Sequence, residues 1–149
     1  MLGWLKTNTK MARDKLSAEV TKFKNNDFME AVVAGCAMVA AADGNISAEE
    51  KRKMTGFIQQ SDELKVFEMS KVIASFDSVV QKFDFDPEIG RAEALKTINK
   101  LSKKPDAARL LVRVCCAIGS ADGDFDADER AVCRTICNEL GLNPADFDL

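Results

Sequence analysis

The sequence predicts an all-α fold, a bundle of seven or eight helices that forms one domain over residues 1–149. Three observations support this prediction. Apolar residues recur at helical spacings along most of the chain, and no stretch shows a convincing strand pattern. Capping residues, prolines and glycines divide the chain into pieces of helix length. The 149 residues are 46% hydrophobic and 30% charged, which is the composition of a globular protein with one core.

Three helices are expected in the first part of the chain. The first, over residues 2–24, is amphipathic and basic, with six Lys or Arg against two acidic residues, a net charge of +4. The second, from about 28 to 42, is almost wholly apolar and ends at an Asp-Gly pair, because glycine readily adopts the left-handed conformation that ends helices. A capping box, Ser47 with Glu50 three residues later, starts the third, which ends near residue 60.

Proline and capping residues divide the rest of the chain in the same way. Asp86 followed by Pro87 is a helix start, because aspartate caps the first turn and proline is tolerated there. The helices expected in this part are 62–83 with a break near Glu68–Ser70, 87 to about 101, about 105–121, and 126 to Gly141, followed by a short turn at 143–147.

Two stretches of the chain are similar to each other, "ADGNISAEE" at 42–50 and "ADGDFDADE" at 121–129. Their Asp-Gly pairs lie 79 residues apart (122 − 43), and at this offset the preceding apolar helices also align. Each copy therefore predicts a helical hairpin, made of an apolar helix, a turn and a capped helix. We expect two such hairpins, about 28–60 and 105–140, packed about a pseudo-two-fold axis.

Local structure accounts for most residues of the two turns. A glycine ends each apolar helix, an N-cap opens the next helix, a glutamate completes its capping box, and an apolar residue before the cap can staple onto the helix. In chain order within each copy, these residues are Gly44, Ile46, Ser47 and Glu50, and Gly123, Phe125, Asp126 and Glu129.

Asp43 and Asp122 need a further explanation, because a carboxylate at a helix C-terminus costs a few tenths to about 1 kcal/mol. Each side chain could accept an N–H from its own turn, or it could bind a metal ion. The spacing is not that of an EF-hand, since Val39 and Ala41 would then occupy the first two ligand positions of the first copy. At most the pattern is half a calcium loop, with an aspartate and a glutamate eight residues apart counted inclusively.

Hard divalent cations such as calcium, magnesium or manganese suit the carboxylates of these turns. The second turn is denser in acidic residues, and such crowding of like charge is costly without a cation or solvent. The candidate metal ligands are Asp43, Glu50, Asp122 and Glu129, with Asp124, Asp126 and Asp128 as additional ones.

Composition argues against several classes of function. The absence of histidine excludes Ser-His-Asp and Cys-His catalysis, and no nucleophile, phosphate loop or cofactor motif is recognisable, so we do not expect an enzyme. A net charge of −3 gives no reason to expect nucleic-acid binding. No signal peptide opens the chain, and its longest apolar run, 31–42, is too short to span a bilayer. We therefore expect a cytoplasmic protein.

The five cysteines and the basic N-terminus each allow two interpretations. The cysteines include no CxxC pair, which indicates free thiols in a reducing compartment, and we favour core packing over a thiol reaction. The segment 1–24 either docks on the acidic remainder of the chain or contacts a membrane through Leu2 and Trp4. Both can hold if only its first turns are free.

The stretch "KNNDFMEAVVAGCAMVAAADGNISAEEKRKMTGFI", with "ELKVFE", "FDFDPEIG" and "ADGDFDADE", resembles the tellurite-resistance TerB family nearly from end to end. The resemblance implies an all-α fold akin to the N-terminal region of membrane-anchored DnaJ-like proteins. It also implies a cytoplasmic stress protein that works with the integral membrane protein TerC and other tellurite-resistance proteins. Metal ligation in the family carries over here to Asp43, Glu50, Asp122 and Glu129.

Together these observations predict a non-enzymatic module that binds metal and protein partners at the cytoplasmic face of the membrane in the tellurite-stress system. One alternative is a protein-interaction adaptor without metal, in which the acidic turns are only caps and a docking surface. Another is a thiol-based tellurite scavenger. Only the metal hypothesis needs the charge of Asp43 and Asp122, and burial of the cysteines would argue against the scavenger.

Overall fold

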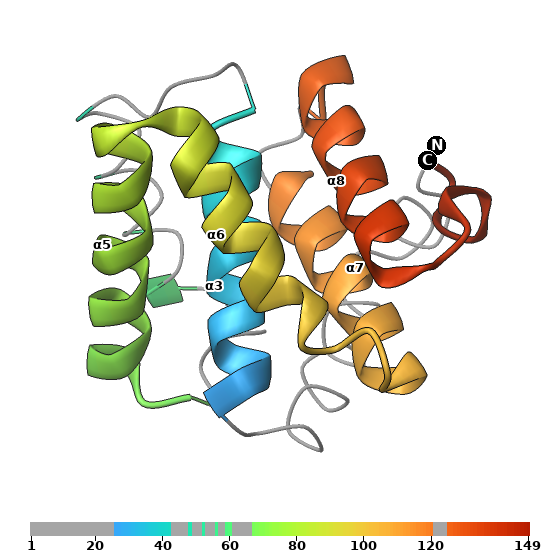
Figure 1. Ribbon diagram of the computed structural model, residues 1–149, viewed down its shortest axis with the longest axis horizontal. Helices are drawn as coiled ribbons and strands as arrows, with labels where there is room; N and C mark the ends of the chain where they lie inside the picture. The colour runs from blue at the N-terminus through green and yellow to red at the C-terminus, as the bar shows by residue number, and fades with distance from the viewer. Residues whose placement is uncertain are drawn as a thin grey trace.

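The computed structural model describes residues 26–42, 67–120 and 125–149, together with Ala48, Arg52, Gly56, Gln59 and Gln60. In this part of the chain all regular structure is helical, as predicted (Figure 1). The elements are α3 (Asn26–Ala40), α5 (Met69–Phe85), α6 (Pro87–Asn99), α7 (Pro105–Gly119), α8 (Ala127–Leu140) and a 3-10 helix, η1 (Pro144–Phe147).

The helix boundaries agree closely with the sequence prediction. The expected break near Glu68–Ser70 is the start of α5, with Glu68 at its N-cap, and Gly141 ends α8 in the left-handed conformation with φ 71°. The first expected helix, 2–24, and most of the third lie outside the described residues, so the structure shows five α-helices and does not test the total of seven or eight. None of the described helices is both long and apolar enough to cross a membrane.

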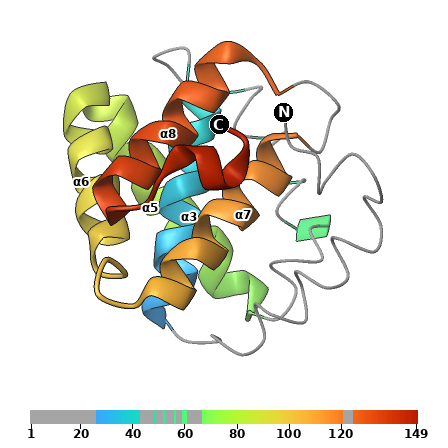
Figure 2. The ribbon, with the colours of Figure 1, turned by 90° about the vertical axis from the view of Figure 1, so that its right-hand side faces the viewer.

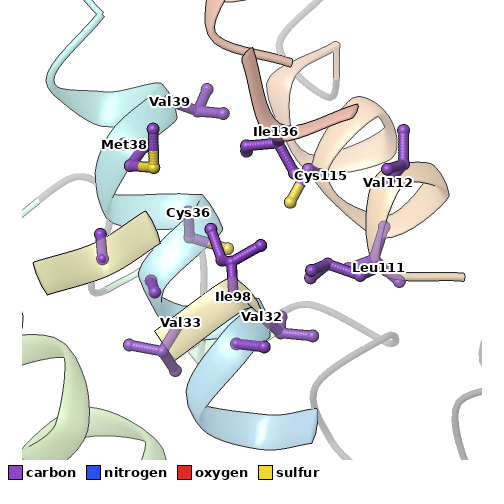
Figure 3. Packing of buried hydrophobic residues seen from close by; sticks show 14 of the residues in the cluster. Val32, Val33, Cys36, Met38, Val39, Ile98, Leu111, Val112, Cys115 and Ile136 are labelled. Carbon is purple, nitrogen blue, oxygen red and sulfur yellow. The ribbon is translucent and has the colours of Figure 1, made fainter. Parts of the chain in front are cut away.

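Helix α3 lies at the centre of the bundle and packs against α5, α6, α7 and α8 (Figure 2). Its side chains from Phe28 to Val39 are buried except that of Glu30, which explains why the sequence of this helix is so apolar. Figure 3 shows residues of α3 facing Leu111 and Cys115 of α7 and Ile136 of α8 across the core.

Close contact between α3 and α7 depends on Gly35. A Cβ atom at this position would lie 2.5 Å from the Sγ atom of Cys115, well inside van der Waals contact. The missing side chain therefore lets the two apolar helices of the predicted repeat approach each other at the level of Cys115.

The bounds of α3 and α7 support the internal repeat. Their first residues are 79 positions apart (105 − 26), and so are their last residues (119 − 40), the same offset that aligns the two Asp-Gly pairs. The second helix of the hairpin is described in full only for the second copy, as α8. The pseudo-two-fold arrangement of two complete hairpins therefore remains a prediction.

Candidate metal site at the acidic turns

The structure describes three of the seven predicted metal ligands, and all three lie at the start of α8. Asp126 is the N-cap of this helix, and Asp128 and Glu129 are in its first turn. The other four, Asp43, Glu50, Asp122 and Asp124, lie outside the described residues.

The two acidic turns leave the bundle from neighbouring helix ends. A Cβ atom built on Gly119, the last residue of α7, would lie 3.6 Å from Cγ1 of Val39, one residue before the end of α3. Figure 1 shows α3 and α7 running towards the same end of the molecule, where α8 begins. Asp43 follows the last residue of α3 by three positions, and Asp122 follows the last residue of α7 by the same number.

The predicted capping box at the start of α8 is confirmed. The Glu129 backbone N–H donates to Oδ1 of Asp126 at 2.8 Å, and the Asp126 backbone N–H donates to Oε1 of Glu129 at 3.0 Å. Both donors belong to backbone groups that the helix itself cannot satisfy. The pair therefore has a structural role, and it fixes two carboxylates beside the turn.

Phe125, the residue before the cap, is half-buried against the end of α7. A Cβ atom on Gly119 would lie 2.8 Å from Cε1 of its ring, so the absence of a side chain at Gly119 makes room for the ring. The predicted staple onto α8 takes an unusual form, because the residue at the usual contact position is Arg130. Its guanidinium carbon lies 5.7 Å from the centre of the Phe125 ring, a cation–π arrangement.

Arg130 also holds the last residues of the chain, a role that could not be expected from the sequence. One of its Nη atoms donates to the backbone carbonyl of Asp148 at 2.8 Å. Asp148 has φ 59°, the left-handed conformation that ends η1. A single side chain therefore connects the start of α8 to the last residues of the chain. The two partners are 18 positions apart, so no local sequence pattern indicates the hydrogen bond.

The described carboxylates do not form a metal site by themselves. One oxygen of Asp126 and one of Glu129 accept hydrogen bonds in the capping box, and Asp128 is exposed in the first turn. Among the residues that the structure describes, no three histidine, cysteine or acidic side chains are grouped so as to hold a metal ion. A site at this turn would therefore need Asp122 or Asp124 in addition.

All five cysteines are free thiols buried in the core, which confirms the predicted core packing. They are Cys36 of α3, Cys115 and Cys116 of α7, and Cys133 and Cys137 of α8. Figure 3 shows the sulfur atoms of Cys36 and Cys115 pointing towards each other across the α3–α7 interface. No thiol among these is exposed to a reagent in solution.

The surroundings of Cys115, Cys116 and Cys137 keep these three thiols protonated. Burial, followed by the neighbouring Cys36, raises the pKa of Cys115 well above that of an ordinary thiol. The pKa of Cys116 is raised by a hydrogen bond with Cys133 and then by burial, and burial raises the pKa of Cys137 to about 12. Because the thiolate is the nucleophile, these groups are poor candidates for a reaction with an oxyanion in solution.

Comparison with known proteins gives two consistent matches. The family model described as "Tellurite resistance protein TerB" matches residues 29–149. A protein from Alcaligenes sp named "Tellurium resistance protein TerB" is 47% identical over 102 residues, which are 68% of this chain and 84% of that protein. No solved structure matches the chain significantly.

Proposed function

The chain belongs to the TerB family of tellurite resistance proteins, and we propose that it is a non-enzymatic module that binds a divalent cation and protein partners at the cytoplasmic face of the membrane. The observation that carries the metal part of this proposal is the close approach of Val39 to Gly119, where only the space of an added Cβ separates them, since it brings the ends of α3 and α7 together. Three residues of extended chain reach about 10 Å, so Asp43 and Asp122 can serve one shared site or two neighbouring ones.

In this proposal Asp43 and Asp122 bind the cation together with Glu50 and Glu129, and Asp124, Asp126 and Asp128 add negative charge around it. The capping box supports this role, because a carboxylate already fixed by one hydrogen bond loses less freedom when its second oxygen binds a cation. Calcium, magnesium and manganese are the cations whose preference for oxygen ligands fits these side chains.

Titration of the full-length protein with calcium, magnesium and manganese, followed by calorimetry and thermal unfolding, tests the proposal. Wild type should bind at least one of these ions with a micromolar-to-millimolar dissociation constant and unfold at a higher temperature in its presence. The double variant Asp122→Asn with Glu129→Gln should lose most of that stabilisation. Glutamine can still accept the capping hydrogen bond, so the variant should match wild type in the absence of metal.

An unchanged response of the double variant to every ion would refute a metal site at the second turn. The chain would then fit the adaptor without metal, in which the acidic turns contribute only caps and a docking surface. Asp43→Asn provides the equivalent test at the first turn.

The partners we propose are the integral membrane protein TerC and other tellurite-resistance proteins, with additional contact to the membrane through the basic segment 1–24. Six Lys or Arg in this segment favour a surface of anionic lipid. Deletion of residues 1–8 should weaken binding to phosphatidylglycerol-containing vesicles and leave the melting temperature unchanged. A deletion that unfolds the protein would show that these residues belong to the core.

The alternative thiol-based scavenger is disfavoured by the burial of all five cysteines. A thiol-specific reagent should react slowly with the native protein and completely in denaturant. Rapid reaction at three or more positions of the native protein would favour the scavenger again.

A further inference from the structure

The corner between α5 and α6 carries two large apolar side chains that are exposed to solvent instead of packing in the core. Phe85, the last residue of α5, is 82% exposed, and Ile89, in the first turn of α6, is 45% exposed. In the part of the chain that the structure describes, these are the two large hydrophobic side chains that remain exposed. We call Phe85 and Ile89, with the adjacent acidic residues Asp84 and Glu88, the Phe85 corner.

Hydrogen bonds hold the backbone of the Phe85 corner, so Phe85 is exposed at an ordered connection between two helices. Oδ1 of Asp86 accepts from the backbone N–H groups of Glu88 and Ile89 at 2.8 and 3.4 Å, and the Asp86 N–H donates to the Lys82 carbonyl at 3.1 Å. The buried ring of Phe83 packs on Gly90, where an added Cβ would lie 2.6 Å from its Cγ. A fixed backbone lowers the entropy cost of binding at this surface.

Charge near the corner selects the kind of partner. Residues 82–93 contain four acidic side chains and two basic ones, and the exposed Asp84 and Glu88 each lie one residue from Phe85 or Ile89. One of the two basic residues, Arg91, is directed towards α8, where its guanidinium donates to Oγ1 of Thr135 at 3.3 Å. The other basic residue, Lys82, is exposed in the last turn of α5, so the corner offers an apolar anchor with a rim that is acidic on balance.

We propose that the Phe85 corner binds a Lys/Arg-rich segment with an apolar face, belonging to the cytoplasmic side of a membrane protein. The identity of the partner class rests on the proposed function, which places the protein at the membrane. Short cytoplasmic loops of membrane proteins carry an excess of Lys and Arg, so their charge complements this rim. An apolar side chain of the segment covers the Phe85 ring, the type of aromatic anchor that dominates binding energy at protein interfaces.

The same charges argue against two other occupants. An anionic lipid surface would be repelled by the exposed Glu88 and by the excess of acidic residues over 82–93. A symmetric contact between two copies of this chain would bring two acidic rims together, because residues near the axis of such an interface face their own counterparts. Both remain distinct outcomes of the experiment.

The test uses full-length protein and a fluorescent synthetic helix of about 18 residues that has leucine on one face and lysine elsewhere. Binding is measured by anisotropy at low and high salt. Three comparison probes are the same helix with glutamate in place of lysine, a sequence isomer with scattered leucines, and phosphatidylglycerol-containing vesicles. None of these measurements involves tellurite or metal, so failure of the metal and resistance roles would leave the result unchanged.

The lysine helix should bind wild type, and Phe85→Ser should weaken binding at least tenfold while leaving the melting temperature unchanged, since the ring is on the surface. Glu88→Gln should weaken binding about two- to fivefold and reduce its dependence on salt. The matched control, Asp106→Asn, removes an exposed acidic residue from the start of α7, at the opposite end of the bundle (Figure 1). It should change the affinity less than twofold.

Several results would overturn the proposal. They are no binding of the lysine helix, equal binding to Phe85→Ser, equal binding of the glutamate helix or the scattered isomer, and vesicle binding that depends on Phe85. Sedimentation that shows a Phe85-dependent dimer of the protein alone would also overturn it and would identify a second copy as the occupant.

Discussion

Two helix pairs of this protein begin their second helix in the same way and differ in what the preceding phenylalanine does. In the α5–α6 pair, Phe85 precedes the N-cap Asp86, and in the α7–α8 pair, Phe125 precedes the N-cap Asp126. Phe85 is 82% exposed, whereas Phe125 is half-buried against Gly119 and under the guanidinium of Arg130. The same local pattern, Phe-Asp before a helix, therefore leaves the phenylalanine exposed at the α5–α6 corner and half-buried at the α7–α8 corner.

The difference arises from where each pair places its glycine. In α5–α6, Gly90 follows the N-cap, and the ring of Phe83 packs against it. The space beside Gly90 is therefore filled by Phe83, and Phe85 remains exposed to solvent. In α7–α8, Gly119 precedes the turn and receives Phe125 itself. Whether the residue before an N-cap packs onto the protein therefore depends more on the room that a neighbouring helix leaves for it than on the capping motif itself.

The pairs also differ in their thiols, and the largest predicted effect follows from this. Four cysteines lie in α7 and α8, and none lies in α5 or α6. Burial raises the pKa of Cys137 to about 12, and the thiols of Cys115 and Cys116 are also shifted upward. The folded protein thus keeps protons that the unfolded chain releases above about pH 8.5.

Stability should therefore be unaffected by these thiols below about pH 8.5 and should fall as the pH rises towards 12. Within that window the free energy of unfolding falls as the pH rises, because the unfolded chain ionises these thiols while the folded protein keeps them protonated, and the slope grows with the number of thiols involved. Urea unfolding at several alkaline pH values measures the slope. The slope of the free energy of unfolding against pH is proportional to the number of protons released on unfolding, and in Cys137→Ala this number should be smaller by about one. An equal slope in the variant would show that Cys137 does not cause the pH dependence.

Alanine at the two glycines should distinguish the two corners. At Gly90 the new Cβ would lie 2.7 Å from the Cα atom of Phe83, and backbone cannot move aside, so Gly90→Ala should cost about 2–3 kcal/mol. At Gly119 the nearest atom belongs to the half-buried ring of Phe125, which can shift outward, and the cost should be about 1 kcal/mol. If the two variants lose the same free energy of unfolding, the Phe125 ring cannot shift outward to accommodate the new Cβ atom.

Gly56 provides the control for both changes. It has helical backbone, and no described residue lies within 4 Å of a Cβ atom added there. Gly56→Ala should stabilise the protein by about 0.5–1 kcal/mol, the usual gain from alanine in a helix.

Removing each phenylalanine ring tests the comparison directly. Phe125→Ala should lower the free energy of unfolding by about 1–2 kcal/mol, because a half-buried ring and its contact with Arg130 are lost. Phe85→Ala should change it by less than about 0.5 kcal/mol, because the ring is on the surface. Both are measured by urea unfolding, and a large loss on removing Phe85 would mean that the ring has a structural role.

The sequence predicted the described elements well because caps, prolines and apolar spacing are local signals. Asp86 with Pro87, the Asp126–Glu129 box and Gly141 all fall where expected. The opposite exposure of Phe85 and Phe125 could not be predicted, since it depends on glycines that contact another helix. In the repeat alignment Gly119 corresponds to Ala40, so the internal similarity gave no indication of its role.

The candidate site was predictable only in its local part. The capping box follows from residues three apart, and it is confirmed. The close approach of Val39 to Gly119 joins residues 80 positions apart, and the hydrogen bond from Arg130 to Asp148 joins residues 18 positions apart. Neither leaves a periodic signal in the sequence. Metal binding by Asp43, Glu50, Asp122 and Glu129 stays a prediction, because three of these four residues lie outside the described part.

The two N-caps should contribute similarly even though only one belongs to a capping box. Asp126→Ala removes one hydrogen bond of a reciprocal pair, and Asp86→Ala removes an oxygen that accepts from two N–H groups. Each should cost about 1 kcal/mol, measured by urea unfolding. Asparagine at either position retains an accepting oxygen and should recover most of the loss. A much larger loss for Asp126→Ala in metal-free buffer would show that the cap stabilises more than its own helix.

The smallest predicted effect concerns Arg130, which closes the α7–α8 corner from the outside. Arg130→Met keeps most of the apolar stem over the Phe125 ring but loses the positive charge and the hydrogen bond to the Asp148 carbonyl. Because both interactions are near the surface, the loss should be about 0.5–1 kcal/mol. The effect should be local. Amide hydrogen exchange should quicken at residues 146–149, in the second half of η1 and just after it, while the α5–α6 corner stays unchanged, since Arg130 makes no described contact there. Lysine at this position should restore the charge but not the geometry of the guanidinium, and should recover only part of the protection. Faster exchange at the α5–α6 corner in the methionine variant would show that the two corners are coupled, and the contrast between Phe85 and Phe125 would then reflect one shared constraint instead of two independent ones.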